Sequence, residues 1–270
     1  MKLLTRLASV LAVCLLALPA QAQVLPQQLL NQQRGLQGNN IRACVDDFSP
    51  GGKLDRAVAQ AIADALFLKV EYVPALRGFP LDGDGYLAEM QVHLTNDCDL
   101  LMGVAVQPNS PFPEWAAVTR PYANVPFVLA VADPSYTKLG DIPVGSTIGT
   151  AIASLGERVF ATTMLQRPKD QRWKRLPYAD NKLMLTRLLE GKLAGMLLWQ
   201  PALAQLMAED PAAANLKVAA LDPVPAANVQ VGALIASSNT YLRSQVDNAI
   251  AELTDDGTIT QIMADLSMAQ

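Results

Sequence analysis

The feature that most constrains the fold is an alternation of short apolar runs with longer stretches of helical periodicity. Ile41–Val45 is a short apolar run that predicts a strand. Leu54–Phe67 then places apolar residues three and four positions apart, which predicts an amphipathic helix. The pattern continues as strand, helix and strand over Lys69–Val73, Tyr86–Leu94 and Asp99–Val104. Strands separated by helices pair in parallel, so this order predicts an α/β fold with doubly wound sheets.

The same rhythm returns in the second half of the chain. We predict strands at Phe127–Val131, Thr147–Thr150, Ala194–Trp199 and Val229–Ala236. We predict helices at Leu155–Leu165, Lys182–Glu190, Tyr241–Leu253 and Thr258–Leu266. The length is sufficient for one large domain or two small ones.

Residues 1–22 have the pattern of a cleaved export signal. Lys2 and Arg6 supply positive charge, and Leu7–Leu18 is an apolar run too short to span a bilayer. Residues 20–22 have the small-residue pattern of a cleavage site, so we expect a periplasmic mature chain that begins at Gln23. Residues 23–36 are polar and predict a loose lead-in. Cys14 also permits lipidation, which the bulky residue before it disfavours.

The charge excludes nucleic acid as an expected partner. The formal net charge is −4, and it becomes about −6 when the two cations of the signal are removed. Binding of phosphate backbones needs a basic face, which this composition does not supply. No segment after the signal is long and apolar enough to be a membrane helix. We therefore expect a protein that is not embedded in the membrane. We also expect it to be a monomer.

Cys44 and Cys98 remain after cleavage, and an even pair in an exported chain predicts a disulfide. The bridge forms without distortion if the two strand-like segments are neighbours. Two buried reduced thiols are the alternative. His93 is the only histidine and lies within a predicted helix, so we interpret it as a helix-surface residue rather than a catalytic base. We expect no metal site and no cofactor, because no cluster of metal-ligand residues appears.

Several short motifs, taken in chain order, carry a family resemblance. The first is Gly52-Lys53-Leu54-Asp55 with the helix that follows it. The others are Leu68–Pro74, Cys98–Gly103, Thr119-Arg120-Pro121-Tyr122, Leu189–Ala194 and Asp255–Ile259. Each motif alone is weak, but together they span nearly the whole mature chain. They resemble solute-binding protein family 3, which has the type II periplasmic binding protein fold.

The resemblance implies two α/β lobes joined by two hinge strands, each lobe with a mainly parallel, doubly wound sheet. Lobe 1 would comprise residues 37–125 and 234–270, and lobe 2 residues 126–233. The hinge strands would lie near Asn124–Val128 and Val229–Leu234. Ligands of this fold bind between the lobes at the carboxyl ends of the strands.

Two tryptophans depart from the family pattern. Amino-acid binders carry an arginine after the third strand, where Trp115 is found, and an aspartate in lobe 2, where Trp199 is found. A zwitterion would meet apolar surface at both places, and a desolvated unpaired charge is costly. The departures predict a small planar or partly apolar ligand stacked between the two indole rings. Packing into the core is the alternative for each ring.

Five further residues are predicted to bind the ligand. Phe48 would form an aromatic floor or pack on the next helix, and Arg77 would pair with an anionic group or with a surface acid. Arg120 would pair with the ligand or form an ion pair between the lobes. Ser154 and Asp180 begin helices whose free N–H groups favour a ligand oxygen, or they act as ordinary caps.

The resulting prediction is a non-catalytic periplasmic binding protein that delivers its ligand to an ABC permease. The chain also resembles proteins that are encoded with quinoprotein alcohol dehydrogenases. This resemblance rests on Arg77, Gly78, Phe79, Trp199 and Pro201. Such a protein would serve a quinoprotein dehydrogenase, with pyrroloquinoline quinone (PQQ) as a ligand for Arg77, Arg120 and Lys182. One alternative is an enzyme such as a cyclic-acid dehydratase, with an acid from Asp47, Glu114 or Asp180. Another is a docking protein with an empty cleft.

Overall fold

A computed structural model describes residues 38–75, 84–106 and 112–268, which belong to one compact unit, Arg34–Gln270. The predicted signal peptide, the lead-in at residues 23–36 and Arg77 lie outside the described residues. Within the described part of the chain, no helix is long and apolar enough to cross a membrane.

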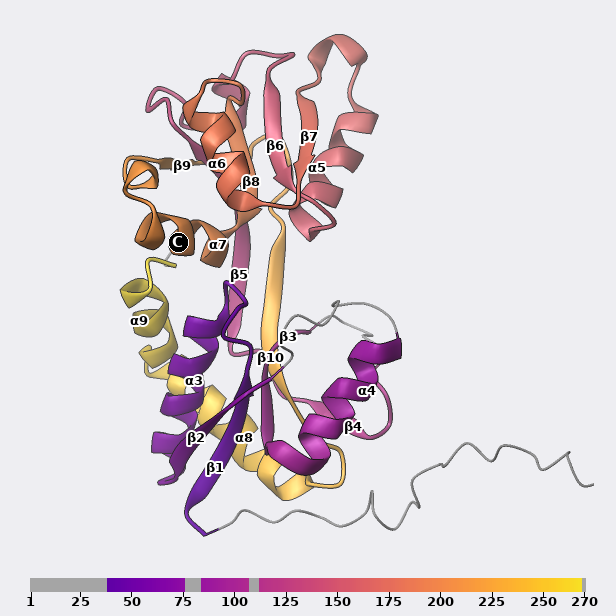
Figure 1. Cartoon of the computed structure of the whole chain (residues 1–270), viewed down its shortest axis with the longest axis vertical. Coiled ribbons are helices and arrows are strands. Elements are labelled where there is room, and N and C mark those ends of the chain that lie inside the picture. Colours follow the sequence, from indigo (N-terminus) through magenta and orange to yellow (C-terminus); the bar gives the residue numbers. More distant parts are fainter. Residues whose placement is uncertain (1–37, 76–83, 107–111, 269–270) are drawn as a thin grey trace, which may run out of the picture. The chain divides into compact units, whose positions relative to one another are not determined.

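The first lobe is built on three parallel strands. β1 (Asn40–Val45) lies between β2 (Lys69–Pro74) and β3 (Leu100–Val106), and it pairs in parallel with both (Figure 1). The helices of this lobe are α3 (Gly52–Ala65), α4 (Asp84–Val92), a π-helical turn η1 (His93–Asp97), α8 (Thr240–Asp255) and α9 (Thr258–Asp265).

α3 shows how the sequence pattern produces this packing. Leu54, Val58 and Ile62 recur at helical spacing and are fully buried. They join a hydrophobic cluster with side chains of β1, β10 and α8, so that one face of α3 covers the sheet. Burial of such a stripe is the main source of stability for a helix of this length.

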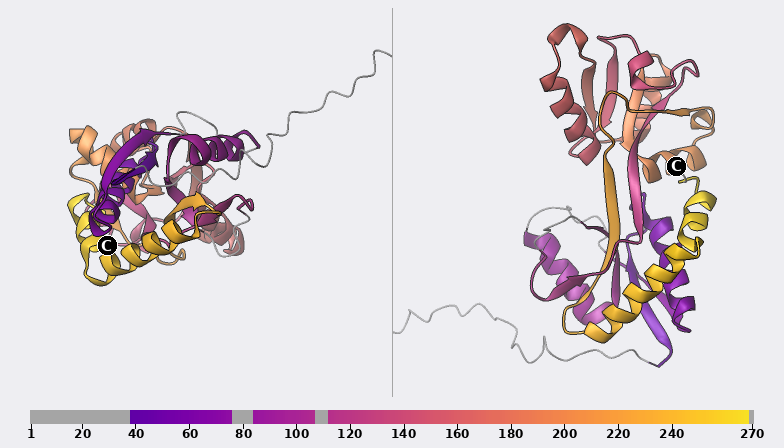
Figure 2. Two further views of the ribbon diagram at one scale, coloured as in Figure 1. Left: turned by 90° about the horizontal axis from the view of Figure 1, so that it is seen from below. Right: turned by 180° about the vertical axis from the view of Figure 1, so that it is seen from behind.

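Two long antiparallel strands connect the lobes. β5 (Ala123–Val131) pairs with β10 (Asn228–Ala236) over four residue pairs, from Ala123 with Val231 to Pro126 with Asn228. β10 continues along β3 and along the short strand β4 (Ala116–Val118), whereas β5 continues along β8 and β9. The two strands run side by side in Figure 1 and in the right panel of Figure 2. They occupy the positions predicted for the hinge strands.

The second lobe repeats the parallel arrangement. β6 (Thr147–Ala151) pairs in parallel with β7 (Lys174–Tyr178) and with β8 (Gly195–Trp199), and β8 pairs antiparallel with β5. Its other elements are α5 (Leu155–Gln166), α6 (Asn181–Leu189), α7 (Gln200–Glu209), β9 (Lys217–Ala219) and the short 3₁₀ turns η2 (Leu139–Asp141), η3 (Lys169–Gln171) and η4 (Pro211–Ala213).

The sheet path runs β2-β1-β3-β10-β5-β8-β6-β7, with β4 on β10 and β9 on β5. The parallel pairs lie near the outer ends of this path, and every pair that involves β5 or β10 is antiparallel. The sheet is therefore mixed, with helices packed on it, as expected for the predicted α/β fold.

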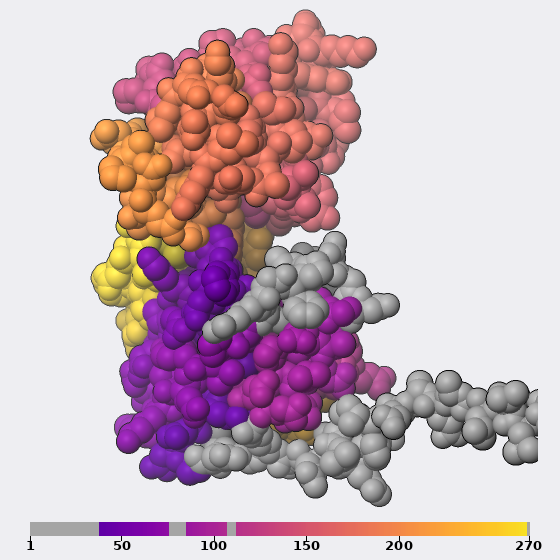
Figure 3. Space-filling view, viewed as in Figure 1, coloured from indigo at the N-terminus to yellow at the C-terminus, as the bar shows by residue number. Residues whose placement is uncertain are grey.

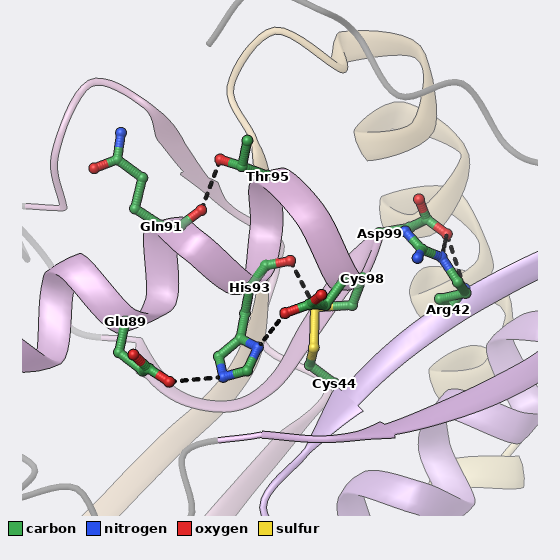
Figure 4. The surroundings of a disulfide bond; sticks show 9 residues. Arg42, Cys44, Glu89, Gln91, His93, Thr95, Cys98 and Asp99 are labelled. Atoms are coloured by element: carbon green, nitrogen blue, oxygen red, sulfur yellow. Dashed lines mark hydrogen bonds and ion pairs between the residues drawn. A yellow bond between two sulfur atoms is a disulfide. The ribbon is translucent and has the colours of Figure 1, made fainter. Parts of the chain in front are cut away.

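Cys44 and Cys98 form a disulfide, with their Cα atoms 5.6 Å apart. Cys44 is on β1, and Cys98 immediately precedes the neighbouring strand β3 (Figure 4). Asp99 adds a second link between the strands, because its carboxylate accepts a hydrogen bond from the backbone N–H of Arg42 at 2.8 Å. The two links fix β1 beside β3.

Candidate functional site

The region where the two lobes meet is the candidate site. After the parallel strands, α3 follows β1, α5 follows β6, α6 follows β7 and α7 follows β8. Open α/β sheets bind ligands at the carboxyl ends of such strands. The residues after these strand ends therefore decide what the site can hold.

Trp199 is the central residue of the site. It ends β8, directly precedes α7, and packs against hydrophobic clusters of both lobes. A Cβ atom built on Gly51, the residue before α3, would lie only 3.0 Å from Cη2 of Trp199. The ring edge therefore rests on the backbone of lobe 1. The Nε1 atom of Trp199 is buried and has no hydrogen-bond partner among the described residues.

A buried acid lies next to this contact. Asp55 is in the first turn of α3 and is 3% exposed. Its Oδ1 atom accepts a hydrogen bond of 2.5 Å from the hydroxyl of Tyr122. The hydroxyl oxygen of Tyr122 in turn accepts a bond of 3.0 Å from the backbone N–H of Gly103. One polar network thus joins α3, β3 and the residue that precedes β5.

Burial raises the pKa of Asp55 to about 7; the hydrogen bond from Tyr122 lowers it and the charge of Asp46 raises it. Burial also raises the pKa of Tyr122 well above its usual value. Sequence reasoning did not single out either residue, although both lie in the family motifs. Asp55 could have been found from its position on the apolar stripe of α3, because a carboxylate that is buried there needs a hydrogen-bond partner.

The start of α5 holds a second buried carboxylate. Glu157 accepts hydrogen bonds from the N–H of Ala153 at 2.7 Å and from the hydroxyl of Thr150 at 3.1 Å. It also forms an ion pair with Arg175, with Nη1 and Oε1 2.6 Å apart. Sequence reasoning missed Glu157 as well. The signal was the capping-box spacing of Ser154 and Glu157.

Apolar side chains are exposed near the same strand ends. Phe48 follows β1, Ile152 follows β6, and Leu183 lies in the first turn of α6 after β7. Their exposed fractions are 73%, 55% and 44%. We call these three residues the apolar rim. Single exposed apolar residues are ordinary on a protein surface, and each of these three follows the carboxyl end of a parallel strand.

Trp115 does not lie in this region. It precedes β4, whose residues Ala116 and Val118 pair with Ala236 and Leu234 of β10. Leu234 also pairs with Leu101, which lies near the amino end of β3. Ala116 pairs two residues further along β10, with Ala236, so β4 begins beyond the amino end of β3. Trp115 packs against the cluster that contains the disulfide. The structure therefore places Trp115 near the amino end of β3 and Trp199 at the carboxyl end of β8.

The two predicted helix-start residues act as caps. Ser154 Oγ accepts the backbone N–H of Glu157 at 3.1 Å. Asp180 Oδ1 accepts the N–H groups of Lys182 and Leu183 at 2.8 and 3.3 Å. Both residues follow strand ends of lobe 2, so they lie at the predicted place, with the capping role as their structural function.

The predicted cations contribute little to the described site. Arg120 is exposed, and its backbone N–H donates to Asp247 of α8 at 2.7 Å. Lys182 forms an exposed ion pair with Glu209 of α7 at 3.0 Å. Arg77 lies outside the described residues. No predicted cation forms a direct ion pair between the lobes within the described ranges.

The three acids considered for an enzymatic role either accept hydrogen bonds from other parts of the protein or lie beside Trp115, away from the strand ends of the site. Both carboxylate oxygens of Asp47 accept hydrogen bonds from Arg56, at 2.7 and 2.8 Å. Asp180 caps α6, and Glu114 is exposed beside Trp115. The ring nitrogens of His93 lie 3.3 Å from Glu89 and 2.9 Å from Asp97 (Figure 4), and its side chain is 14% exposed. Among the described residues, no group of three metal-ligating side chains occurs.

A cavity of about 620 Å³ adjoins the contact between Trp199 and Gly51. It is shared by the loop and first turns of α3, by α7 and by the end of α9, and Figure 3 shows the orange surface around α7 next to the indigo surface of α3. The lining of this cavity includes none of the described residues that were predicted from the sequence to bind the ligand. Its apolar lining residues are Pro50, Pro201, Ala204, Met207, Ala208, Ala214, Leu266 and Met268.

Comparisons with known proteins identify the fold. No family model and no curated protein matches the sequence. Solved structures do match. A substrate-binding domain of a putative amino acid ABC transporter from Streptococcus pneumoniae superposes with a TM-score of 0.63 at 18% identity, over 85% of this chain and 100% of that one.

Two further structures agree. The second substrate-binding domain of GlnP from Lactococcus lactis, in an open conformation, gives a TM-score of 0.64 at 16% identity, over 85% and 96% of the two chains. An ancestral cationic amino acid solute-binding protein gives 0.61 at 18% identity, over 84% and 95%. The chain is similar to these proteins in fold, which is the two-lobed type II periplasmic binding fold.

Proposed function

We propose that this protein is a non-catalytic, extracytoplasmic solute-binding protein whose lobes close on a small, partly apolar molecule. The position of Trp199 carries the proposal. It stands at the carboxyl end of β8 and reaches across to the start of α3. A side chain that contacts both lobes can respond to a ligand held between them, and hinge motion about two connecting strands is the usual closure of such folds.

The chemistry of the ligand is inferred from the side chains around the lobe boundary. The apolar rim of Phe48, Ile152 and Leu183 favours a molecule with an apolar face. The buried indole N–H of Trp199 lacks a partner among the described residues and favours an acceptor oxygen on that molecule. A planar molecule with carbonyl or carboxylate oxygens has both properties, and Arg120 or Arg77 would then pair with a carboxylate.

The partner is inferred from the kind of protein that shares the fold. Two of the similar structures are substrate-binding domains of transporters, which favours an ABC permease as the recipient of the ligand. A quinoprotein dehydrogenase system is the second candidate partner, and it rests only on the sequence resemblance at Arg77, Gly78, Phe79, Trp199 and Pro201. PQQ is planar and carries carboxylates, so it is a suitable first probe.

Native mass spectrometry of the protein purified from its own cells tests the binding role, and calorimetric titration with PQQ tests the ligand class. We expect a bound small molecule in the first experiment and saturable binding in the second. A different co-purified molecule with no binding of PQQ would retain the solute-binding role and replace the ligand. Neither a co-purified molecule nor binding would favour the docking alternative.

A pair of tryptophan variants makes the test specific to the site. Trp199→Phe keeps an apolar ring but removes the indole N–H, so we expect weaker binding of whichever molecule is identified. Trp115→Phe is the matched control, because Trp115 packs beside the disulfide near the amino end of β3. Equal loss of affinity in both variants would contradict the assignment of Trp199.

A further inference from the structure

Asp55 occupies a position that links the hinge to the contact between the lobes. Its partner Tyr122 immediately precedes the hinge strand β5 and is itself held by the backbone of β3. Asp55 also lies one turn after Gly51, on which Trp199 rests. A change at Asp55 therefore reaches both the start of the hinge and the surface that contacts lobe 2.

The glycines beside Asp55 show how closely its carboxylate is surrounded. A Cβ atom on Gly103, which has a φ of +80°, would lie 2.5 Å from Oδ2 of Asp55. A Cβ atom on Gly51 would lie 3.7 Å from the same oxygen and 3.0 Å from Cη2 of Trp199. The carboxylate and the edge of the indole ring therefore adjoin the same point of the backbone. The edge of the indole ring is therefore one of the groups that lie near this buried carboxylate.

The groups around Asp55 do not neutralise it. Within α3, Arg56 forms its ion pair with Asp47. At the end of β1, the negative charge of Asp46 opposes ionisation of Asp55. From β8 and α7, Trp199 and Gln200 present no ionisable group, and β3 presents the backbone of Gly103. The position in the first turn of α3 favours the ionised form through the helix dipole, but burial outweighs it.

We propose that protonation of Asp55 controls the contact between the lobes, so that the neutral acid favours Trp199 resting on Gly51 and the ionised acid favours separation. Ionisation next to an apolar ring is costly, and moving the ring away admits water to the carboxylate. Because loss of the proton and exposure of Asp55 are linked equilibria, a rise in pH favours the state in which the Asp55 carboxylate is exposed to water. Binding of a ligand between the lobes would then depend on pH near neutrality.

Carbon-13 NMR of the Asp55 carboxyl group tests the first step, and it needs no ligand. We expect a titration midpoint close to 7 in the unmodified protein. In Trp199→Ala we expect the midpoint to fall by about one pH unit or more, because water replaces the ring. A midpoint in the usual carboxylate range in the unmodified protein would overturn the proposal, and so would a midpoint that Trp199→Ala leaves unchanged.

Small-angle X-ray scattering tests the second step. We expect a larger radius of gyration at about pH 9 than at about pH 5, with the change centred on the titration of Asp55. Asp55→Asn should abolish the change, whereas Asp64→Asn, at an exposed position on the same helix, should retain it. A constant radius in the unmodified protein, or the same change in Asp55→Asn, would refute the coupling.

Tyr122→Phe provides an independent variant if Asp55→Asn folds poorly. The hydrogen bond from Tyr122 lowers the pKa of Asp55, so its loss should move both the NMR midpoint and the scattering transition to higher pH. A shift to lower pH, or no shift, would contradict the network. Because none of these measurements uses a ligand, their failure would leave the proposed binding role standing.

Discussion

Gly51 and Trp199 lie so close that a Cβ atom at position 51 would be 3.0 Å from Cη2 and 3.2 Å from Cζ3 of the indole. The backbone of Gly51 is right-handed, with φ −78° and ψ −13°, so a side chain there is excluded by the neighbouring ring rather than by the backbone. This contact is a direct link between the two lobes, and it can be tested with a single substitution.

Gly51→Val should displace the Trp199 ring and expose it to water. We expect a red shift of tryptophan fluorescence relative to the unmodified protein, because an indole that loses an apolar neighbour gains polar surroundings. The same substitution in a Trp199→Phe background is the control and should give no shift, since the atoms nearest to a side chain at position 51 belong to Trp199 and Asp55 and not to Trp115 or Trp173. An equal shift in both backgrounds would show that lobe 1 itself had changed.

Asp55 should make the protein less stable as the pH rises. Its pKa is about 7 in the folded protein and near 3.8 in the unfolded chain, so the folded state binds more protons between these values. The free energy of unfolding should therefore fall from about pH 4 to about pH 7, by roughly 4 kcal/mol from this residue. Asp133, Asp141 and Asp256 act in the opposite direction, because hydrogen bonds lower the pKa of each.

Urea unfolding of Asp55→Asn and of the unmodified protein across this pH range isolates the contribution of Asp55. The difference between the two should grow in favour of the variant as the pH rises. A difference that stays constant with pH would mean that Asp55 ionises normally in the folded protein.

The disulfide should be complete and strongly stabilising. Quantitative thiol labelling of the denatured, unreduced mature protein should detect no free Cys44 or Cys98. The bridge closes a loop with a sequence separation of 54, for which chain entropy predicts a loss of about 4 kcal/mol in the Cys44→Ser, Cys98→Ser double variant. Labelling of two thiols per chain would contradict the assignment.

Ordinary α-amino acids should bind weakly or not at all. In the sequence resemblance, Trp199 takes the place of an aspartate that amino-acid binders carry, and residues 107–115, which follow β3, contain no arginine or lysine to hold an α-carboxylate. A calorimetric screen of the standard amino acids should give no affinity in the micromolar range. Micromolar binding of any of them would show that other residues supply both anchors.

Glu157 should contribute more to stability than an exposed acid does. Glu157→Ala removes a buried acceptor of three hydrogen bonds and leaves Arg175, Thr150 and Ala153 without it, so we expect a loss of about 3 kcal/mol. Glu190→Ala is the matched control, because its ion pair with Arg187 is exposed and screened by water, so its removal should change stability little. Chemical denaturation of both variants provides the comparison, and equal losses would contradict it.

The elements that could be predicted from the sequence are those with a regular apolar period. α3 and the strands β1, β3 and β8 have such periods and bury the residues that the pattern indicated. β7 and β4 were not predicted, because β7 is mostly exposed and β4 has only three half-buried residues. α7 was not predicted either; it begins at Gln200 directly after β8, with Pro201 in its first turn.

The site was harder to predict than the fold, for a physical reason. Trp199 could be placed because β8 is a regular strand whose carboxyl end is readily located. Trp115 could not, because the segment between β3 and β4 has no period that fixes its register. Asp55 was overlooked because its importance depends on Tyr122 and Gly103, which are distant in sequence and meet only through the sheet.

The disulfide closes residues 44–98 into a covalent ring that contains α3, β2 and α4. β5 and β10 both lie outside that ring. The two strands that would bend during opening are therefore separate from the segment that the disulfide constrains. Gly51 and Asp55 lie inside it, on the part that the bond holds together. Reduction should therefore loosen the segment that carries Gly51 and Asp55, and it would reach the hinge through the hydrogen bond between Asp55 and Tyr122.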